Sequence, residues 1–147
     1  MAEVVIGLVG ALVGATAAVA GQFVVRRREE RERWVGLLLE DCAKIYVLED
    51  SYIGAIWEAF GELKQPARLK DWSRTDRAQA QARLTIVCTD DALLSVADSL
   101  RENGRAMWHA ASSGDQPEWD RLLDKHRQNL ARFVARAKIT ARQGQTI

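Results

Sequence analysis

The sequence predicts an all-α protein in which an N-terminal transmembrane helix continues into an antiparallel bundle of about four cytoplasmic helices. Two observations predict this class. An uncharged apolar run lies near the start of the chain, and apolar residues in the remainder recur at the 3.6-residue period of a helix, with no clean period-two alternation. The predicted organisation is an anchor over 1–25, a charged collar over 26–34, the bundle over 35–142 and a disordered tail over 143–147.

The apolar run extends from Val4 to Val25, and its only polar side chains are Thr16 and Gln22. As a helix it is about 33 Å long, enough to cross a bilayer core of about 30 Å. Two other interpretations stay open: a cleaved signal peptide, because the segment 18–20 (Ala-Val-Ala) resembles a cleavage site, and a buried helix of a soluble protein. The length of the run and the lack of a basic side chain before it favour a single span.

One face of the predicted span carries small residues. They are Gly7, Gly10, Gly14, Ala18 and Gly21. Helices in lipid associate through close backbone packing, so such a face indicates pairing with a second copy or with the span of a partner protein. The alternative is that Gly and Ala are simply common in membrane helices.

A charged collar follows the span. Its basic residues are Arg26, Arg27, Arg28, Arg31 and Arg33. Because Lys and Arg beside a span stay in the cytoplasm, these arginines are the predicted topology determinants. The sequence therefore predicts a single-pass protein of the cell membrane, with the N-terminus outside and the C-terminal domain cytoplasmic.

The rest of the chain is expected to form helices joined by short connections. The first runs to about Leu63, before Gln65-Pro66. Its apolar stripe includes Val35, Leu38, Cys42, Ile45, Tyr52, Ile56 and Phe60, and a second row of Leu39, Tyr46 and Ile53 widens it.

Turn and capping residues mark the later helices. One helix is expected from Ser73 to about Cys88, and the next begins after the cap at 89–91 and continues past Gly104. The last begins at Asp115. Short loops between amphipathic helices favour an antiparallel bundle.

The segments 82–90 (ARLTIVCTD) and 114–119 (GDQPEW), together with the Gly/Ala-rich span and the Arg/Glu collar, give the chain a familiar appearance. It resembles uncharacterised small single-span membrane proteins of high-GC bacteria with an Ala/Arg-rich cytoplasmic helical domain. The resemblance covers nearly the whole chain, and it implies a membrane location but no activity.

No phosphate loop, dinucleotide fingerprint, nucleophile elbow or zinc-protease motif occurs, so an enzyme is not expected and no catalytic, cofactor or metal site is predicted. Cys42 and Cys88 are interpreted as small buried residues. His126 is interpreted as a core or boundary histidine with satisfied hydrogen bonds, and His109 as a surface residue. The acidic pairs at 40–41 and 49–50 are interpreted as solvated faces, and the pair at 90–91 as a helix cap.

The last helix carries a basic face formed by Arg121, Lys125, Arg132 and Arg136. This face either complements the acidic first cytoplasmic helix within the domain, or contacts anionic lipid head groups or a protein partner. Nucleic acid is not expected, because no aromatic residues interleave with the basic ones and the formal net charge is only +1.

These features favour a non-catalytic, membrane-anchored adaptor or scaffold that self-associates through its span. The alternative is a membrane-active effector, of the holin or defence type, whose spans oligomerise on a cytoplasmic trigger. The expected partners are membrane lipid, a second copy or a partner membrane helix, and a cytoplasmic protein.

Overall fold

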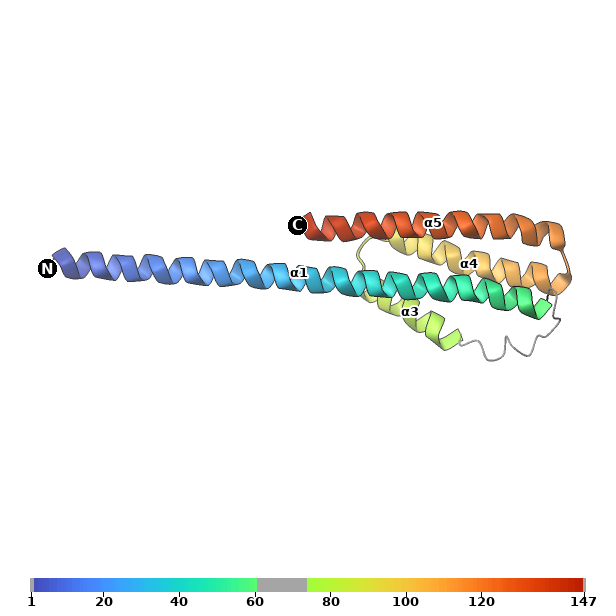
Figure 1. Ribbon diagram of the computed structural model, residues 1–147, viewed down its shortest axis with the longest axis horizontal. Coiled ribbons are helices and arrows are strands. Elements are labelled where there is room, and N and C mark those ends of the chain that lie inside the picture. The colour runs from blue at the N-terminus through green and yellow to red at the C-terminus, as the bar shows by residue number, and fades with distance from the viewer. Residues whose placement is uncertain (1, 61–73, 147) are drawn as a thin grey trace.

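The computed structural model describes the backbone of residues 2–60 and 74–146, and the side chains of residues 22–60 and 75–144. Within these ranges the chain forms four helices and no strand: α1 (Ala2–Phe60), α3 (Arg74–Val87), α4 (Asp91–Ser113) and α5 (Gln116–Thr146). Successive helices run in opposite directions (Figure 1). The predicted antiparallel helical bundle is therefore confirmed.

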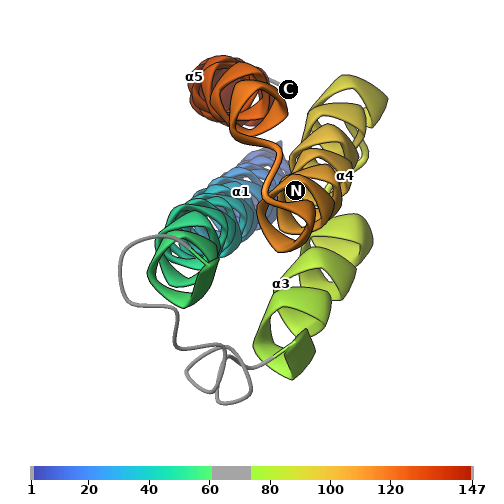
Figure 2. The same ribbon diagram turned by 90° about the vertical axis from the view of Figure 1, so that its right-hand side faces the viewer.

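The helix α1 is the central element, since it packs against α3, α4 and α5. Viewed along its axis, α3 lies on one side of it and α5 on the other (Figure 2). The N-terminal part of α1 projects beyond the bundle as an uninterrupted helix (Figure 1). Because α5 runs back along α1, the C-terminus lies at the end of the bundle from which α1 projects.

Trp34 closes that end of the bundle. Its indole Nε1 donates a hydrogen bond to the carbonyl oxygen of Val87 at 2.9 Å, and its ring lies against Gly144 near the end of α5. A Cβ on Gly144 would overlap the indole ring of Trp34, so only glycine fits there. The packed part of α1 therefore begins at Trp34, the last residue of the collar, and Val35.

The predicted caps are in place. Asp90 accepts hydrogen bonds from the backbone N–H groups of Ala92 and Leu93 at the start of α4. Asp115 accepts one from Glu118 at the start of α5. Between them, Gly114 ends α4 with φ of +72°, a left-handed conformation that favours glycine.

The described core has two apolar clusters. The cluster nearer the collar contains residues of all four helices, among them Leu38, Leu84, Leu100 and Phe133. The cluster at the far end is built around Ile56, Met107, Trp119 and Leu122. Buried polar side chains lie between the two clusters, and they define the candidate site described below.

The structure corrects part of the predicted core. Leu39 and Tyr46 are 43% and 40% exposed, so they do not widen the buried face of α1. Their place is taken by Asp41 and Glu49, each 1% exposed, and the interpretation of these two acids as part of solvated faces was wrong. The reason is the phase of the helix: neighbours in an acidic pair lie about 100° apart, so one member of each pair faces inward.

One helix end differs from the expected one. The helix α5 continues to Thr146, although a disordered tail was predicted from residue 143. The predicted end of the first helix at about Leu63 lies outside the described residues. The contact between Gly144 and Trp34 explains the longer helix, because it packs the last turns of α5 against α1.

Among the described residues, no helix is both long enough and apolar enough to cross a membrane. The predicted span over 4–25 lies almost wholly outside the residues whose side chains are described.

Candidate functional site

A layer of buried polar side chains crosses the bundle between the two apolar clusters. We call it the polar layer. Its members come from all four helices and are Glu49, Arg77, Asn103, His126 and Asn129. Each occupies a position where the helical period would otherwise place an apolar residue, as Glu49 does between Ile45 and Ile53.

Glu49 and Arg77 form the centre of the polar layer. Arg77 donates two hydrogen bonds to the carboxylate, each 2.5 Å long, in a bidentate arrangement. Burial raises the pKa of Glu49 above its ordinary value, and this effect outweighs the opposing influence of the Arg77 guanidinium. Arg77 also lies over the ring of Tyr52, with 4.3 Å from its guanidinium carbon to the ring centroid.

A glycine on α4 makes this arrangement fit. A Cβ on Gly104 would lie 2.9 Å from Arg77 Nη2 and 3.2 Å from the ring of Tyr52. The absence of a side chain at Gly104 thus lets α4 approach the stacked pair of Arg77 and Tyr52.

His126 and Asn103 are incompletely satisfied. Asn103 donates to the carbonyl oxygen of Leu122 at 2.9 Å, but its Oδ1 finds no partner in the described part of the protein. Neither ring nitrogen of His126 has a hydrogen-bond partner there, although the residue is 2% exposed. Burial lowers the pKa of His126 to about 4, helped by the charge of Arg77 and opposed by Asp50. His126 is therefore a core histidine as predicted, but its hydrogen bonds are not satisfied.

A cavity of about 670 Å³ adjoins the polar layer between α3 and α4. Tyr52 and Arg77 border it on the side of the polar layer, and three residues of α4 one turn apart, Arg101, Arg105 and His109, line it. This exposed position of His109 agrees with its interpretation as a surface residue.

The cavity has one described acid, and that acid is already engaged. Asp98 accepts a hydrogen bond from Gln81 at 2.9 Å and forms an ion pair with Arg101 at 3.4 Å. The hydrogen-bonding capacity of Arg101 is not fully used, because its buried Nε has no hydrogen-bond partner among the described residues. Arg105 is exposed and forms no ion pair with another described side chain. The lining is therefore cationic overall.

The two cysteines are free and buried. Burial raises the pKa of Cys42 to about 12, with contributions from Cys88 and Asp41, and burial also raises the pKa of Cys88. Both thiols stay protonated near neutral pH and are poor nucleophiles, which agrees with their interpretation as small buried residues.

The predicted basic face of α5 is divided between intramolecular pairs and free surface. Arg136 donates two hydrogen bonds to Asp90, at 2.8 and 2.9 Å, and Arg121 pairs with Glu118 on its own helix. Lys125 and Arg132 are exposed. The hydrogen bonds from Arg136, together with one from Thr140, lower the pKa of Asp90 to about 2 despite partial burial.

The two buried acids of α1 have their ion-pair partners on α3. Asp41 forms an ion pair with Arg83 at 3.0 Å, and Glu49 pairs with Arg77 as described above. These contacts differ from the expected one between α1 and the basic face of α5.

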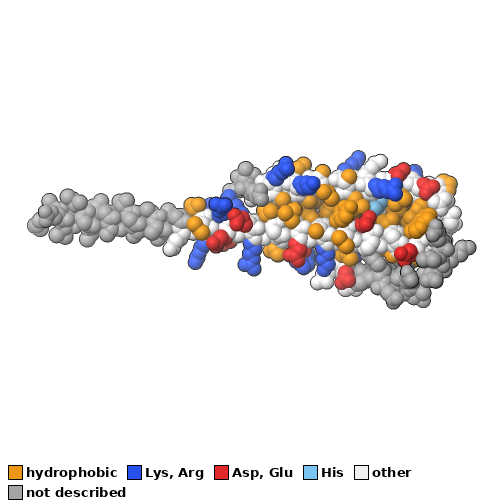
Figure 3. Space-filling model, viewed as in Figure 1, with side chains coloured by type: hydrophobic (Ala, Val, Ile, Leu, Met, Phe, Trp, Pro, Cys, Tyr) orange, Lys and Arg blue, Asp and Glu red, His pale blue; other side chains and the backbone are white. Residues whose placement is uncertain are grey.

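The collar arginines lie on α1 where it leaves the bundle, and their side chains are solvent-facing, with Arg31 half-exposed. Charged side chains of both signs surround this narrow part of the molecule (Figure 3). Arg28 pairs with Glu32 at 3.0 Å, one turn away. The side chains of the predicted association face, from Gly7 to Gly21, lie outside the described residues.

In the described parts of the chain, no three His, Cys, Asp or Glu side chains come together as a metal ion would require. The polar layer and the cavity were not predicted from the sequence. One signal was available: Glu49, Asn103 and His126 each interrupt an apolar stripe at a core position.

No protein family, no curated protein and no solved structure matches this chain.

Proposed function

We propose that the protein is a non-catalytic, membrane-anchored adaptor that holds its helical bundle on the cytoplasmic side of the cell membrane. The observation that supports this most is the continuity of α1, a single helix from Ala2 to Phe60. Its first part has the apolar sequence of a membrane span, and its last part is the central helix of the bundle. An anchor and a core helix in one rod would fix the distance between membrane and bundle.

The spacing along α1 suits such an arrangement. Trp34 is nine positions after Val25, which is about 14 Å of helix and about twice the head-group depth of one leaflet, about 5–8 Å. The collar arginines fill this interval and would meet the phosphates of the cytoplasmic leaflet. The bundle would then begin at Trp34, just beyond the head groups.

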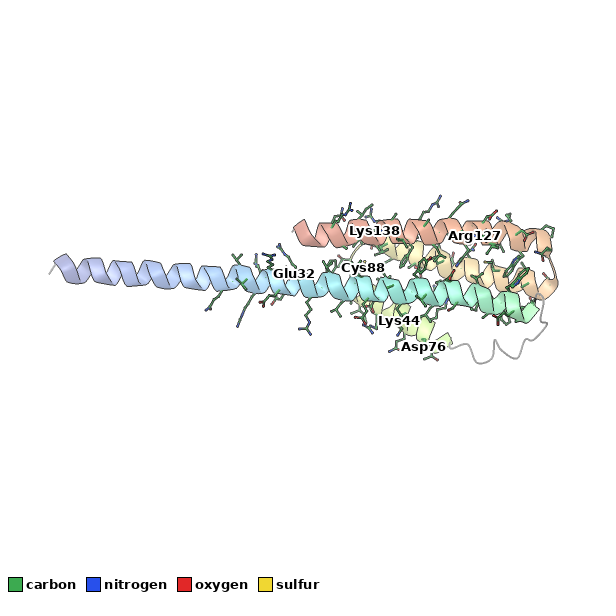
Figure 4. All side chains as sticks on the ribbon, viewed as in Figure 1. Glu32, Lys44, Asp76, Cys88, Arg127 and Lys138 are labelled. Atoms are coloured by element: carbon green, nitrogen blue, oxygen red, sulfur yellow. The ribbon has the colours of Figure 1, made fainter. Side chains whose placement is uncertain are left out.

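The end of α5 would face the same membrane surface. Lys138 is exposed near the collar end of α5, whereas Arg127 lies further along the bundle (Figure 4). Each Lys or Arg close to an anionic surface contributes about 1 kcal/mol to binding. Arg121 and Lys125 are about 20 Å or more further from that end, so they would face a cytoplasmic partner.

Membrane fractionation tests the anchor. We expect the full chain to stay in membranes after an alkaline wash, and the paired substitutions Leu12→Arg and Val13→Arg to release it, because each central arginine costs about 2.5–3.5 kcal/mol. Protease added to intact spheroplasts should leave the C-terminal domain uncut. Washed membranes without the protein, or cleavage of that domain from outside, would overturn the proposal.

Self-association is tested in the membrane. Gly14→Ile should abolish association, because the branched side chain prevents close packing of two spans. Val13→Ile is the matched control, because Val13 is not one of the small residues of the predicted association face. Inducible expression should leave the membrane potential intact, whereas depolarisation would favour a membrane-active effector.

A further inference from the structure

We propose that the cavity between α3 and α4 binds a soluble organic phosphate of about the size of a mononucleotide. The proposal rests on the charge of the lining, on unused hydrogen-bonding capacity and on the volume of the cavity. Only the choice of a soluble ligand over a lipid head group rests on the proposed function.

Charge is the first argument. Arg101 and Arg105 project from successive turns of α4 into the cavity, and His109 follows one turn later. Asp98 is the one described acid in the lining, and Gln81 and Arg101 already engage it. Arg77 is neutralised by Glu49. The lining thus keeps an excess positive charge, centred on Arg105, that is available to a ligand.

Unused donors are the second argument. Arg101 carries a buried Nε without a hydrogen-bond partner in the described chain, and its ion pair with Asp98 is long, at 3.4 Å. Unsatisfied buried donors are uncommon in folded proteins, because each one costs free energy. The Nε atom itself is closed to a ligand, but 42% of the Arg101 side chain is exposed and Arg105 is exposed too. An anion in the cavity would therefore accept hydrogen bonds from the accessible parts of these two guanidinium groups, whose planar shape suits phosphate oxygens.

Size and shape are the third argument. A volume of about 670 Å³ is in the range of small-molecule sites and is far too large for free phosphate alone. The lining also contains apolar surface from Ala78, Ala82 and the ring of Trp108. The ligand that fits carries a phosphate for the arginines and an organic body for this wall.

Position decides the source of the phosphate. Tyr52 at the cavity is 26 residues after Arg26, or about 39 Å along α1. The lining extends from Tyr52 towards Thr85, which is nearer the collar, but Arg105 lies at the Tyr52 end. With the collar at the membrane surface, this end of the cavity is beyond the reach of lipid head groups. A soluble organic phosphate is therefore the expected ligand.

Calorimetry on the full chain in uncharged detergent micelles tests this site, with ADP as the probe. We expect saturable binding of ADP and none of adenosine. Arg105→Gln and Arg101→Gln should each weaken ADP binding about tenfold or more, as the loss of a charge-assisted hydrogen bond does. Arg127→Gln is the matched control: this arginine is on α5, with 69% of its side chain exposed, and its loss should leave the affinity unchanged.

Three results would overturn the site: no binding of ADP, equal binding of adenosine, or equal weakening by Arg127→Gln. A separate arm adds a water-soluble, short-chain anionic phospholipid to the full chain in the same micelles. Binding of this phospholipid that is lost in Arg105→Gln, in place of ADP binding, would assign the cavity to a lipid head group and overturn the soluble ligand. Because the calorimetry does not depend on cellular location, its failure would leave the anchor proposal untouched, and failed fractionation would leave this site standing.

Discussion

His126 is a neutral histidine held in a position where it cannot easily accept a proton. Burial lowers its pKa from 6.5 to about 4, whereas the unfolded chain takes up the proton near pH 6.5. Between these values the unfolded state binds more protons, so stability falls as the pH falls. The slope is about 1.4 kcal/mol per pH unit, and the loss approaches about 3 kcal/mol near pH 4.

Replacing this side chain should remove the slope. We expect His126→Leu to be at least as stable as the natural protein at pH 7, because two unpaired ring nitrogens leave the core. The advantage of the variant should grow by just under about 2 kcal/mol between pH 7 and pH 5. Urea unfolding at the two pH values measures this, and a difference that does not change with pH would contradict the assignment.

Asp90 has two structural roles, as the cap of α4 and as the partner of Arg136 on α5. We expect Asp90→Ala to lower the free energy of unfolding by about 3 kcal/mol, from a lost cap and lost charged hydrogen bonds. Asp90→Asn keeps a capping oxygen and should cost about half as much. The neighbouring Asp91→Ala is the control, since Asp91 is exposed and its loss should cost a few tenths of a kcal/mol.

The low pKa of Asp90 makes stability fall as the pH falls, in the same direction as His126 but over a more acidic range. Its folded pKa of about 2 lies below the ordinary 3.8. The stabilisation is therefore present above about pH 4 and is lost as the pH falls towards 2. The stability of Asp90→Asn should therefore fall less between pH 4 and pH 2 than that of the natural protein. An unchanged acid transition would show that the hydrogen bonds from Arg136 to Asp90 contribute little to stability.

At the scale of the helices, two glycines of similar helical context should respond oppositely to alanine. A Cβ at Gly104 would meet Arg77, which is held by Glu49, and Tyr52. We expect Gly104→Ala to destabilise the protein by about 1–3 kcal/mol through overpacking, despite the better helix propensity of alanine. A Cβ at Gly54 meets nothing within 4 Å, so Gly54→Ala should stabilise by up to about 1 kcal/mol.

Thermal unfolding of the two variants measures this contrast. Equal stabilisation of both would mean that α4 does not approach the stacked arginine and tyrosine as closely as the structure shows. The close approach of Arg77 and Tyr52 explains why the chain has glycine at position 104, inside a helix, where glycine is usually unfavourable.

The helices themselves could be predicted from the sequence, because apolar period, caps and turn residues are local signals. Asp90, Gly114 and Asp115 mark the ends of α4 and the start of α5 as expected. The phase of a wide apolar face is a weaker signal. Leu39 and Tyr46 were expected inside, but the bundle turned Asp41 and Glu49 inward because Arg83 and Arg77 of α3 pair with them.

The candidate site could not be predicted for a related reason. Glu49 and Arg77 form the centre of the polar layer, but they are 28 residues apart in the sequence. The cavity lies between two different helices, α3 and α4. Neither a partner on another helix nor an interhelical gap leaves a local pattern in the sequence. A polar residue inside an apolar stripe is the only hint that sequence provides.

At the scale of the whole molecule, the collar should determine how the protein is oriented, on the proposed function. We expect replacement of Arg26, Arg27 and Arg28 by Asn to give a mixture of both orientations, because positive charge beside a span governs topology. Replacement of Glu29, Glu30 and Glu32 by Gln changes the same number of charges and should leave the orientation unchanged, since acids contribute little. Cleavage by protease in intact spheroplasts measures both, and an effect of the glutamates alone would contradict this role of the arginines.

The contact of Trp34 with Val87 and Gly144 has a practical consequence for anyone who wishes to isolate the bundle. A fragment that starts at residue 35 would lose the indole that joins the end of α3 to the last turns of α5. A fragment that starts within the collar, for example at Arg31, keeps this contact and omits the apolar run. The second fragment is the one to crystallise, and its final helix should resist carboxypeptidase longer than that of the first.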